Sequence, residues 1–422
     1  MDSHDVLIVG AGPIGIELAA GLRGSGLSVL QVEAGVIGST MAWWAPGTRF
    51  FSSPERIEIA GVPLVTPTQD KATREEYLAY LRQVVGARGV DVETYTRVVG
   101  IEREGDGFRV RVRRSLHGVG GAEEYARARA SEGGGETGGI GAPHPGPLPG
   151  GEREGEREVF ARKVVLAIGN MHRPRLVRAA GEDLAHVSHF LQDPHVYAGR
   201  RVLIVGGKNS AVEAAIRLYR VGAHVTMSYR RARLDSERVK YWLLPEIEWL
   251  IRKGKIGFLH CTEVIEIGED SVTLERVGGE LDEACGEHDP ADVHDRQLER
   301  GEDDEAWGMS IEGRAVRALT PGQRVEVDAD FVLLLTGYVQ DPSLFEMAGV
   351  ELVGEERRPR HDPETMETNV PGVYVAGTAC GGSQRRTRVF IETSHAHVGR
   401  IVRALTGVAV EVREAPTGLE ES

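Results

Sequence analysis

Three glycines near the start of the chain have a spacing that suits phosphate binding. Gly10, Gly12 and Gly15 form a GxGxxG turn that contains Pro13 and follows a short apolar run. Such a turn brings backbone N–H groups, and the positive end of the following helix, to a pyrophosphate. Glu33 ends the next apolar run, where its carboxylate can accept two hydrogen bonds from a ribose diol and would repel a 2′-phosphate. The turn, its two strands and the acid predict a dinucleotide site of the kind that suits FAD.

A second turn of similar design follows the apolar run 202–205. Gly206 keeps the first glycine, but Lys208 stands at the second glycine position and Ala211 at the third. Alanine is common at the third position, and lysine adds a positive charge where a phosphate would lie. This segment therefore predicts a second dinucleotide site with a different charge pattern.

The residues after the next strand, 224–228, indicate which nucleotide the second site suits. No acid stands there, and Arg230 and Arg231 follow Tyr229 instead. Guanidinium groups at this corner of a dinucleotide fold can clamp a 2′-phosphate. We therefore predict NADPH rather than NADH, with a solvated basic turn as the alternative.

Three further strands complete the organisation of the chain. The apolar runs 164–169 and 331–337 both end in glycine, and the run 373–377 leads into Thr378, so Gly169, Gly377 and Thr378 are further candidates for cofactor binding. Together the elements predict an α/β fold with two Rossmann-like dinucleotide-binding domains. The FAD-binding domain is split in sequence between 1–185 and 338–422, and the NADPH-binding domain is inserted at 190–337.

Two segments lack the pattern of a packed core. Residues 118–158 are dense in glycine, so they cannot bury enough apolar surface to offset their ordering entropy. The segment 280–305 is strongly acidic: its part from Asp282 to Glu305 holds eleven acidic residues against two arginines and accounts for most of the net charge of −14. We interpret the two segments as insertions without chemistry in the FAD and NADPH domains.

Local patterns predict particular elements around the two turns. Thr73 and Glu76 form a capping-box pattern that opens a helix reaching about Ala87. Apolar periodicity predicts strands at 90–101 and 108–112, and helices at 212–221, 239–252 and 391–405.

The composition favours a reducing compartment and argues against some classes of partner. The net charge of −14 argues against a nucleic-acid or membrane-surface role, and no apolar run approaches the about 18 residues of a membrane span. Three widely spaced cysteines form no CxxC pair, so we expect neither a metal site nor a redox disulfide of that type. The chain enters its first core strand at once, so we predict no signal peptide and a cytoplasmic location.

Several motifs together indicate a family. The chain resembles the flavoproteins of the low-molecular-weight thioredoxin reductase type, and more closely the bacillithiol-disulfide reductase family. The motifs that carry this resemblance lie at residues 10–13, 50–55, 181–189, 206–213, 239–242 and 363–372. The resemblance implies NADPH-dependent reduction of FAD, with electrons passed to a small disulfide or another small acceptor. It assigns FAD to Gly10, Gly12, Gly15 and Glu33, and NADPH to Lys208, Asn209, Ser210, Arg230 and Arg231.

Two positions depart from the pattern of these relatives. Family members usually carry a cysteine in the first glycine turn, where this chain has Ile14. The wider class usually places aspartate where Thr378 stands, and threonine can still hydrogen-bond there. Cys380 follows closely and is the candidate catalytic thiol, with a small structural residue as the alternative. Cys261, in a strand, is expected in the core.

The sequence leaves other roles open. His395 and His397, near the start of the last helix, could donate a proton near the flavin, with a packing role as the alternative. A flavin monooxygenase, a ferredoxin or flavodoxin reductase and a non-enzymatic nucleotide-sensing flavoprotein are alternative functions. Self-association through the FAD domain is a further open point.

Overall fold

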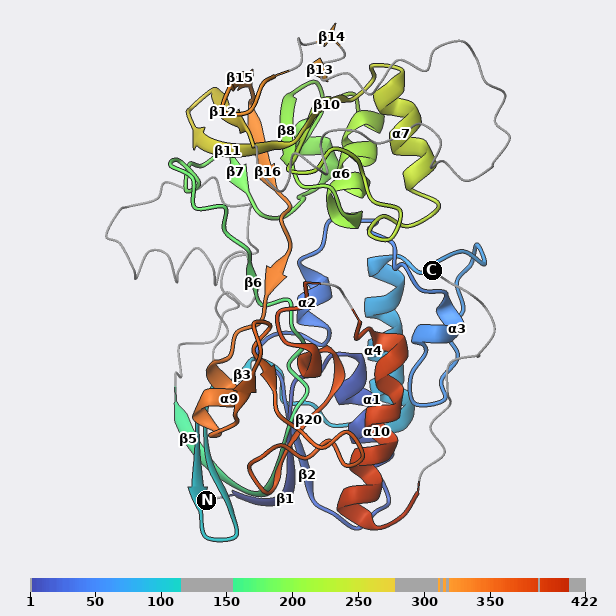
Figure 1. Cartoon of the computed structure of the whole chain (residues 1–422). Helices are drawn as coiled ribbons and strands as arrows, with labels where there is room; N and C mark the ends of the chain where they lie inside the picture. Colours follow the sequence, from blue (N-terminus) through green and yellow to red (C-terminus); the bar gives the residue numbers. More distant parts are fainter. Residues whose placement is uncertain are drawn as a thin grey trace. The chain divides into compact units, whose positions relative to one another are not determined.

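The computed structural model describes residues 2–114, 155–277, 310–311, 314–315, 319–385 and 388–409. These residues form two compact units, coloured along the sequence in Figure 1. The first unit holds the described residues up to Pro174 and from Tyr338 onwards, and the second holds those of Arg175–Gly337. The insertion expected at 280–305 lies outside the described residues. So does most of the one expected at 118–158, although strand β5 (Glu156–Leu166) already begins inside it.

The first division between the units lies earlier in the chain than the interval 185–190 that we predicted. Ile267 N donates to Ala180 O (2.8 Å), so the segment after Pro174 is tied to the second unit. The first and last residues of the second unit are also joined, because Arg175 N donates to Gly337 O (2.9 Å). In the first unit, β6 (Arg173–Pro174) pairs antiparallel with β17 (Tyr338–Val339). The chain therefore leaves and re-enters the first unit at adjacent points.

The first unit is built on a six-stranded sheet with the order β2-β1-β5-β4-β3, and β20 pairs with β5 as well. Its other strands are β1 (Asp2–Val9), β2 (Val29–Val32), β3 (Thr96–Glu104), β4 (Gly107–Arg114) and β20 (Val373–Val375). β2, β1, β5 and β20 run parallel, whereas β4 and β3 form an antiparallel extension. Because parallel strands end at the same edge, the first glycine turn and the segment after β20 lie close together.

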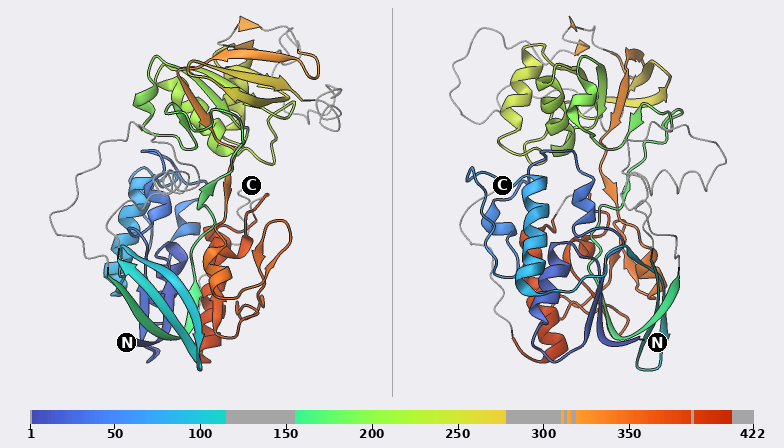
Figure 2. Two further views of the ribbon diagram at one scale, coloured as in Figure 1. Left: turned by 90° about the vertical axis from the view of Figure 1, so that its left-hand side faces the viewer. Right: turned by 180° about the vertical axis from the view of Figure 1, so that it is seen from behind.

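Three long helices belong to this unit: α1 (Pro13–Gly21), α4 (Arg74–Arg88) and α10 (Ile391–Thr406). α1 lies beside both α4 and α10 (Figure 2). The capping box predicted for α4 is confirmed, because Thr73 Oγ1 accepts from Glu76 N (3.2 Å) and the Glu76 carboxylate accepts from Thr73 N (2.7 Å). The shorter elements are α2 (Ser39–Ala42), α3 (Pro54–Ile57), α9 (Ser343–Met347), η3 (Gly377–Gly381), β18 (Leu352–Val353) and β19 (Arg358–Pro359).

The strand predicted at 90–101 begins later than expected. Val90 N donates to Val85 O (3.0 Å), which closes α4 instead of opening a strand. Glu93 forms an isolated parallel bridge with Val32, but Tyr95 then has a φ of +54°, in the left-handed region, so the continuous strand begins only at Thr96.

The second unit contains a seven-stranded sheet with the order β14-β13-β10-β9-β8-β16-β7 and a separate three-stranded sheet, β11-β12-β15. The strands of the larger sheet are β7 (Val187–Ser188), β8 (Arg201–Val205), β9 (His224–Tyr229), β10 (Gly257–His260), β13 (Ser310–Ile311), β14 (Arg314–Ala315) and β16 (Phe331–Leu334). The smaller sheet consists of β11 (Thr262–Ile267), β12 (Ser271–Arg276) and β15 (Arg324–Asp328). The parallel run β10-β9-β8-β16-β7 has the arrangement of a Rossmann-like fold.

The described part of the second unit also contains two helices and one short turn of 3₁₀-helix: α6 (Asn209–Arg220), α7 (Leu244–Arg252) and η1 (Pro194–Tyr197). The prediction that helix 239–252 starts at residue 239 is wrong, since α7 begins at Leu244 with Pro245 in its first turn. The preceding residues form turns, because Lys240 N is held by the side chain of Asn209 (2.8 Å).

Candidate functional site

The first glycine turn lies between β1 and α1, and each glycine meets a different steric demand. Gly10 has a φ of +110°, and a Cβ atom there would lie 2.5 Å from Ala167 O. A Cβ atom on Gly15 would lie 2.2 Å from Gly10 O, so only glycine allows α1 to approach the turn. At Gly12, no described heavy atom lies within 4 Å of the Cβ position, and no side chain caps the helix. This open cradle at the start of α1 is where a pyrophosphate fits.

Glu33, just after β2, is buried beside this turn at 7% exposure. Its carboxylate accepts hydrogen bonds from Ala11 N (2.8 Å), Gly35 N (2.8 Å) and Ser39 Oγ (2.9 Å). These donors fix both carboxylate oxygens, and of the about four lone-pair sites they leave one, on Oε2, for a ribose hydroxyl. The cradle and the fixed carboxylate therefore fit the adenosine diphosphate part of FAD.

The segments after β5 and β20 meet beside the first turn, as the parallel sheet requires. A Cβ atom on Gly377 would lie 3.4 Å from Ile14 Cβ, and one on Gly169 would lie 3.9 Å from Thr378 Oγ1. The structure therefore brings three predicted residues, Gly169, Gly377 and Thr378, to the turn that contains Pro13.

Gln340 joins these segments and was not predicted from the sequence. Its Nε2 donates to Gly169 O (3.2 Å) and to Ala379 O (2.9 Å), and its backbone N donates to Ser383 Oγ (2.8 Å). Nothing in the sequence marks this glutamine, because its partners come from segments about 40 and 170 positions away in the chain. Gln340 fixes the backbone on which Thr378 stands.

Cys380 lies in η3, and its surroundings are those of a core residue. Its exposure is 7%, and burial raises the pKa of the thiol to about 12. The nearest base, His397 Nδ1, lies 3.8 Å from Cys380 Sγ, but it accepts a hydrogen bond from Gly377 N (3.2 Å). Because the thiolate is the nucleophilic form, this geometry favours the structural role of Cys380 over the catalytic one. Cys261 is fully buried.

The two histidines of α10 have different partners. Burial lowers the pKa of His397 to about 4, so its ring is neutral near pH 7. His395 instead contacts Glu17 Oε2 through Nδ1 (2.7 Å) and Arg56 O through Nε2 (3.0 Å), and both partners are acceptors. His395 is therefore an imidazolium paired with a buried carboxylate, and this pair joins α10 to α1.

The second glycine turn lies between β8 and α6. Gly206 has a φ of +146°, and a Cβ atom there would lie 2.5 Å from Leu335 O. A Cβ atom on Gly207 would lie 2.5 Å from the ring of Tyr229, so this position also requires glycine. Lys208 is the residue before the first turn of α6 and has extended backbone, with no side-chain cap on the helix. The N–H groups at the start of α6 therefore face outward for a phosphate.

Cationic side chains surround this turn, and we call them the arginine cluster: Arg175, Arg230, Arg231 and Arg238. Desolvation and the repulsion of these four guanidinium groups lower the pKa of Lys208. Asp235 balances part of this charge, since it lies 2.7 Å from Arg238 and 3.8 Å from Arg231. Such an excess of cations beside a helix N-terminus fits the phosphates of a nucleotide. The predicted Arg230 and Arg231 belong to it, and Arg175 and Arg238 were missed.

The other two residues predicted for the second nucleotide differ in their roles. Ser210 is exposed in the first turn of α6. Asn209 Oδ1 accepts from Lys240 N (2.8 Å), so this side-chain oxygen holds the loop before α7. Arg238 lies in that loop, next to a segment predicted as helix, so its position beside Lys208 could not be foreseen from the sequence.

Two absences can be stated for the described ranges. No helix there is both long and apolar enough to cross a lipid bilayer. In the same ranges, no three side chains of His, Cys, Asp or Glu gather as metal ligands.

A split unit and an inserted unit, each with a glycine turn before a helix, define a two-domain flavoprotein of the dinucleotide-dependent oxidoreductase class. The model of the pyridine nucleotide-disulphide oxidoreductase family matches residues 7–116, 154–284 and 303–377, and the chain belongs to that family. It is therefore an oxidoreductase that depends on FAD and NAD(P), since this family uses both cofactors.

Two relatives and one solved structure show what this chain is similar to within and around the family. Bacilliredoxin reductase Bdr of Bacillus subtilis (strain 168) is 27% identical over 403 residues, which cover 95% of this chain and 97% of that protein. The solved structure of bacillithiol disulfide reductase Bdr from Bacillus cereus has a TM-score of 0.73 and 27% identity, and the match covers 96% of this chain and 99% of that one. A ferredoxin–NADP reductase of Ignicoccus hospitalis is 27% identical over 286 residues, 66% of this chain and 72% of that protein.

Proposed function

We propose that this enzyme takes hydride from NADPH and delivers two electrons to a small disulfide of the bacillithiol disulfide type. The balanced reaction is NADPH, one proton and one disulfide giving NADP⁺ and two thiols. The full-length similarity to Bdr proteins supports the acceptor class. Bound FAD supplies the two-electron chemistry that links the nucleotide to the disulfide.

The arginine cluster is the observation that carries the choice of NADPH. Arg230 and Arg231 follow β9, where the adenosine ribose lies in a Rossmann-like fold, and no carboxylate ends that strand. Lys208 and the N–H groups of α6 would hold the pyrophosphate. On the FAD side, Gly12 and Glu33 bind and orient the adenosine diphosphate part.

In this proposal the described residues position the cofactors and the substrate, and they do not supply a reacting thiol. Ile14 stands where relatives carry a cysteine, and its side chain packs beside Gly377 at 5% exposure. Cys380 is buried and protonated. We therefore propose that neither position relays electrons to the disulfide. We propose the cytoplasm as the location, by the same similarity to Bdr proteins.

Anaerobic stopped-flow spectroscopy tests this function. NADPH should bleach the visible band of the flavin, and bacillithiol disulfide should restore it at a rate that matches turnover. Thiol formation, measured with a thiol reagent, should equal two thiols per NADPH consumed. Bleaching without recovery would refute the disulfide as the acceptor, and an unchanged band would refute electron transfer from NADPH.

A ferredoxin–NADP reductase activity is the second candidate, because one such reductase matches 66% of this chain. In the same instrument, oxidised ferredoxin would then restore the flavin band where the disulfide does not. A single experiment therefore distinguishes the disulfide from ferredoxin as the electron acceptor.

A further inference from the structure

One peptide unit in the first glycine turn is held from both ends, by a side chain of β2 and by that of the residue just after this strand. The carbonyl of Gly10 accepts from Gln31 Nε2 (2.9 Å), and the N–H of Ala11, in the same peptide plane, donates to Glu33 Oε2 (2.8 Å). Gln31 and Glu33 are two residues apart, so their side chains lie on the same face of the strand. Between them, Val32 O accepts from Gly10 N (2.8 Å).

The orientation of this peptide decides whether the turn can form. Gly10 O points toward the position where Gly15 would carry a Cβ atom, at 2.2 Å, and Gln31 Nε2 lies 3.2 Å from that same position. A rotation of the peptide would move Ala11 N away from Glu33, which would lose one of its three donors. Gln31 therefore acts on the carboxylate indirectly, through a backbone unit that the two side chains share.

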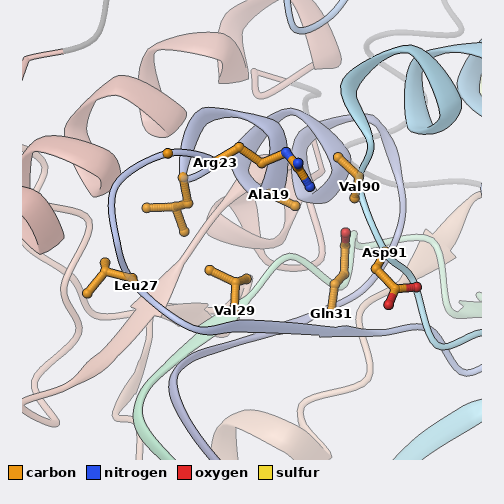
Figure 3. Close-up of a pocket in the computed structure, with 9 residues that line it drawn as sticks. Ala19, Arg23, Leu27, Val29, Gln31, Val90 and Asp91 are labelled. Carbon is orange, nitrogen blue, oxygen red and sulfur yellow. The ribbon is translucent and has the colours of Figure 1, made fainter.

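Of the two polar atoms of the Gln31 amide, the Nε2 donor makes the hydrogen bond in the structure, and the Oε1 acceptor does not. Gln31 is 1% exposed, and among the described residues its Oε1 has no hydrogen-bond partner. The residue lines a cavity of about 260 Å³ together with Ala19, Val29 and Val90, and Figure 3 shows its side chain rising from β2 toward α1. A methionine or leucine would fill this place without burying an unpaired oxygen. The hydrogen bond to Gly10 is what glutamine adds.

We propose that Gln31 is a positioning residue of the FAD site, which holds the Gly10–Ala11 peptide so that Glu33 meets the adenosine ribose. This inference deepens the function proposed above and rests only on its FAD-binding part. It does not depend on the acceptor or on NADPH. FAD affinity is therefore the measurement that tests it.

The first experiment measures FAD binding to the apoprotein of the wild type and of Gln31→Met by flavin fluorescence. Methionine keeps the shape but has no donor, and we expect the Kd of FAD to rise about tenfold for the loss of one buried hydrogen bond. Val29→Ala is the matched control, because Val29 lines the same cavity and its strand partner is Val6 of β1; its Kd should stay unchanged. The circular dichroism spectrum and the urea midpoint of unfolding should be equal in all three proteins and report correct folding.

A second variant, Gln31→Glu, separates positioning from packing through its pH profile. The introduced carboxyl group, when ionised, would oppose Gly10 O and stand close to Glu33, whereas its protonated form can donate to that carbonyl. Burial and the carboxylates of Glu33 and Asp91 raise the pKa of such a group, whereas Arg23, which lines the same cavity, opposes this rise. FAD affinity of this variant, relative to wild type at the same pH, should be weakest at pH 8 and recover to within about threefold at pH 5.5.

The outcomes are distinct. Weak FAD binding by Gln31→Met, with recovery of Gln31→Glu at low pH, supports the positioning role. Unchanged FAD affinity in Gln31→Met, or a Gln31→Glu profile parallel to that of the wild type, overturns it. Wild-type apoprotein that does not bind FAD would instead refute the FAD-dependent function itself.

Discussion

The buried pair of Glu17 and His395 provides the sharpest test of how the first unit is held together. The two side chains are 8% and 5% exposed, and Glu17 Oε2 lies 2.7 Å from His395 Nδ1. The other carboxylate oxygen accepts only from Ala60 N at 3.2 Å among the hydrogen bonds of the described residues. Replacing His395 by leucine therefore leaves a buried carboxylate with a single weak donor.

Removal of one partner from a buried pair costs far more than removal of both. We expect His395→Leu to lower the free energy of unfolding by about 3 kcal/mol, because the charge of Glu17 becomes uncompensated. Glu17→Met should cost about 2 kcal/mol, since the imidazolium can lose its proton to reduce its own penalty. The double variant should fall within about 1 kcal/mol of wild type, because two apolar side chains replace two charges.

The pair also predicts how stability depends on pH. Although burial alone would lower it, the contact with Glu17 raises the pKa of His395 above the 6.5 of an ordinary histidine. The protonated ring is therefore favoured in the folded state. Its contribution is fully present below about pH 6.5 and is lost as pH rises through the folded-state pKa. The stability gap between wild type and His395→Leu should narrow from pH 6 to pH 9.

Urea unfolding of the FAD-loaded proteins, followed by circular dichroism and by release of flavin fluorescence, measures these differences. Arg360→Met is the control, because Arg360 pairs with Glu351 at 2.8 Å but at 63% and 50% exposure, so its loss should cost less than about 1 kcal/mol. Additive losses in the double variant would refute the account of a coupled buried pair. A gap that widens with pH would refute the protonation state assigned to His395.

Three further predictions concern the two sites. Arg230→Ala should raise the KM for NADPH at least about tenfold and leave the KM for NADH unchanged. Arg231→Ala should have a smaller effect, because Arg231 already lies 3.8 Å from the carboxylate of Asp235. Equal losses for both nucleotides in steady-state assays would contradict a 2′-phosphate clamp. Cys380→Ser should retain flavin reduction by NADPH and turnover with the disulfide, and in the wild type iodoacetamide should not alkylate Cys380 at pH 8, because the thiol pKa is about 12; rapid alkylation of the folded protein, detected by mass spectrometry, would contradict its burial. Gly207→Ala should weaken NADPH binding about tenfold while FAD stays bound, since its Cβ would lie 2.5 Å from the ring of Tyr229; calorimetry that shows unchanged NADPH affinity would mean that the ring can move aside.

The sequence could predict the parts of the site that depend on local backbone geometry. Glycines at fixed offsets after a strand identify a turn, because their φ values and close approaches exclude other residues, as at Gly10 and Gly15. The acid after the second strand and the arginines after β9 follow from the same local logic. Both Rossmann-like units were therefore predictable, and the α/β fold is confirmed.

Residues that act through tertiary contacts carried no such signal. Gln31 lies inside an apolar run and reads as an ordinary strand residue, and Gln340 bonds carbonyls from two distant segments. Cys380 looked reactive by position, but its burial depends on the packing of α10 against η3. The boundary at Pro174 was missed because tertiary contacts draw the following segment into the second unit: Ile267 N donates to Ala180 O, and Val177 and Leu184 pack against the core there.

The chain enters and leaves the second unit at Arg175 and Gly337, whose backbones share one hydrogen bond of 2.9 Å. In topological terms the whole unit is a loop whose ends are already closed by β6 and β17. Because the cost of closing a loop grows only with the logarithm of its length, the first unit tolerates this long excursion. Each unit can fold as a cooperative block of its own, and a short turn from Pro174 to Tyr338 would restore a continuous first unit. The same adjacency makes the second unit a cassette that another domain with neighbouring termini could replace.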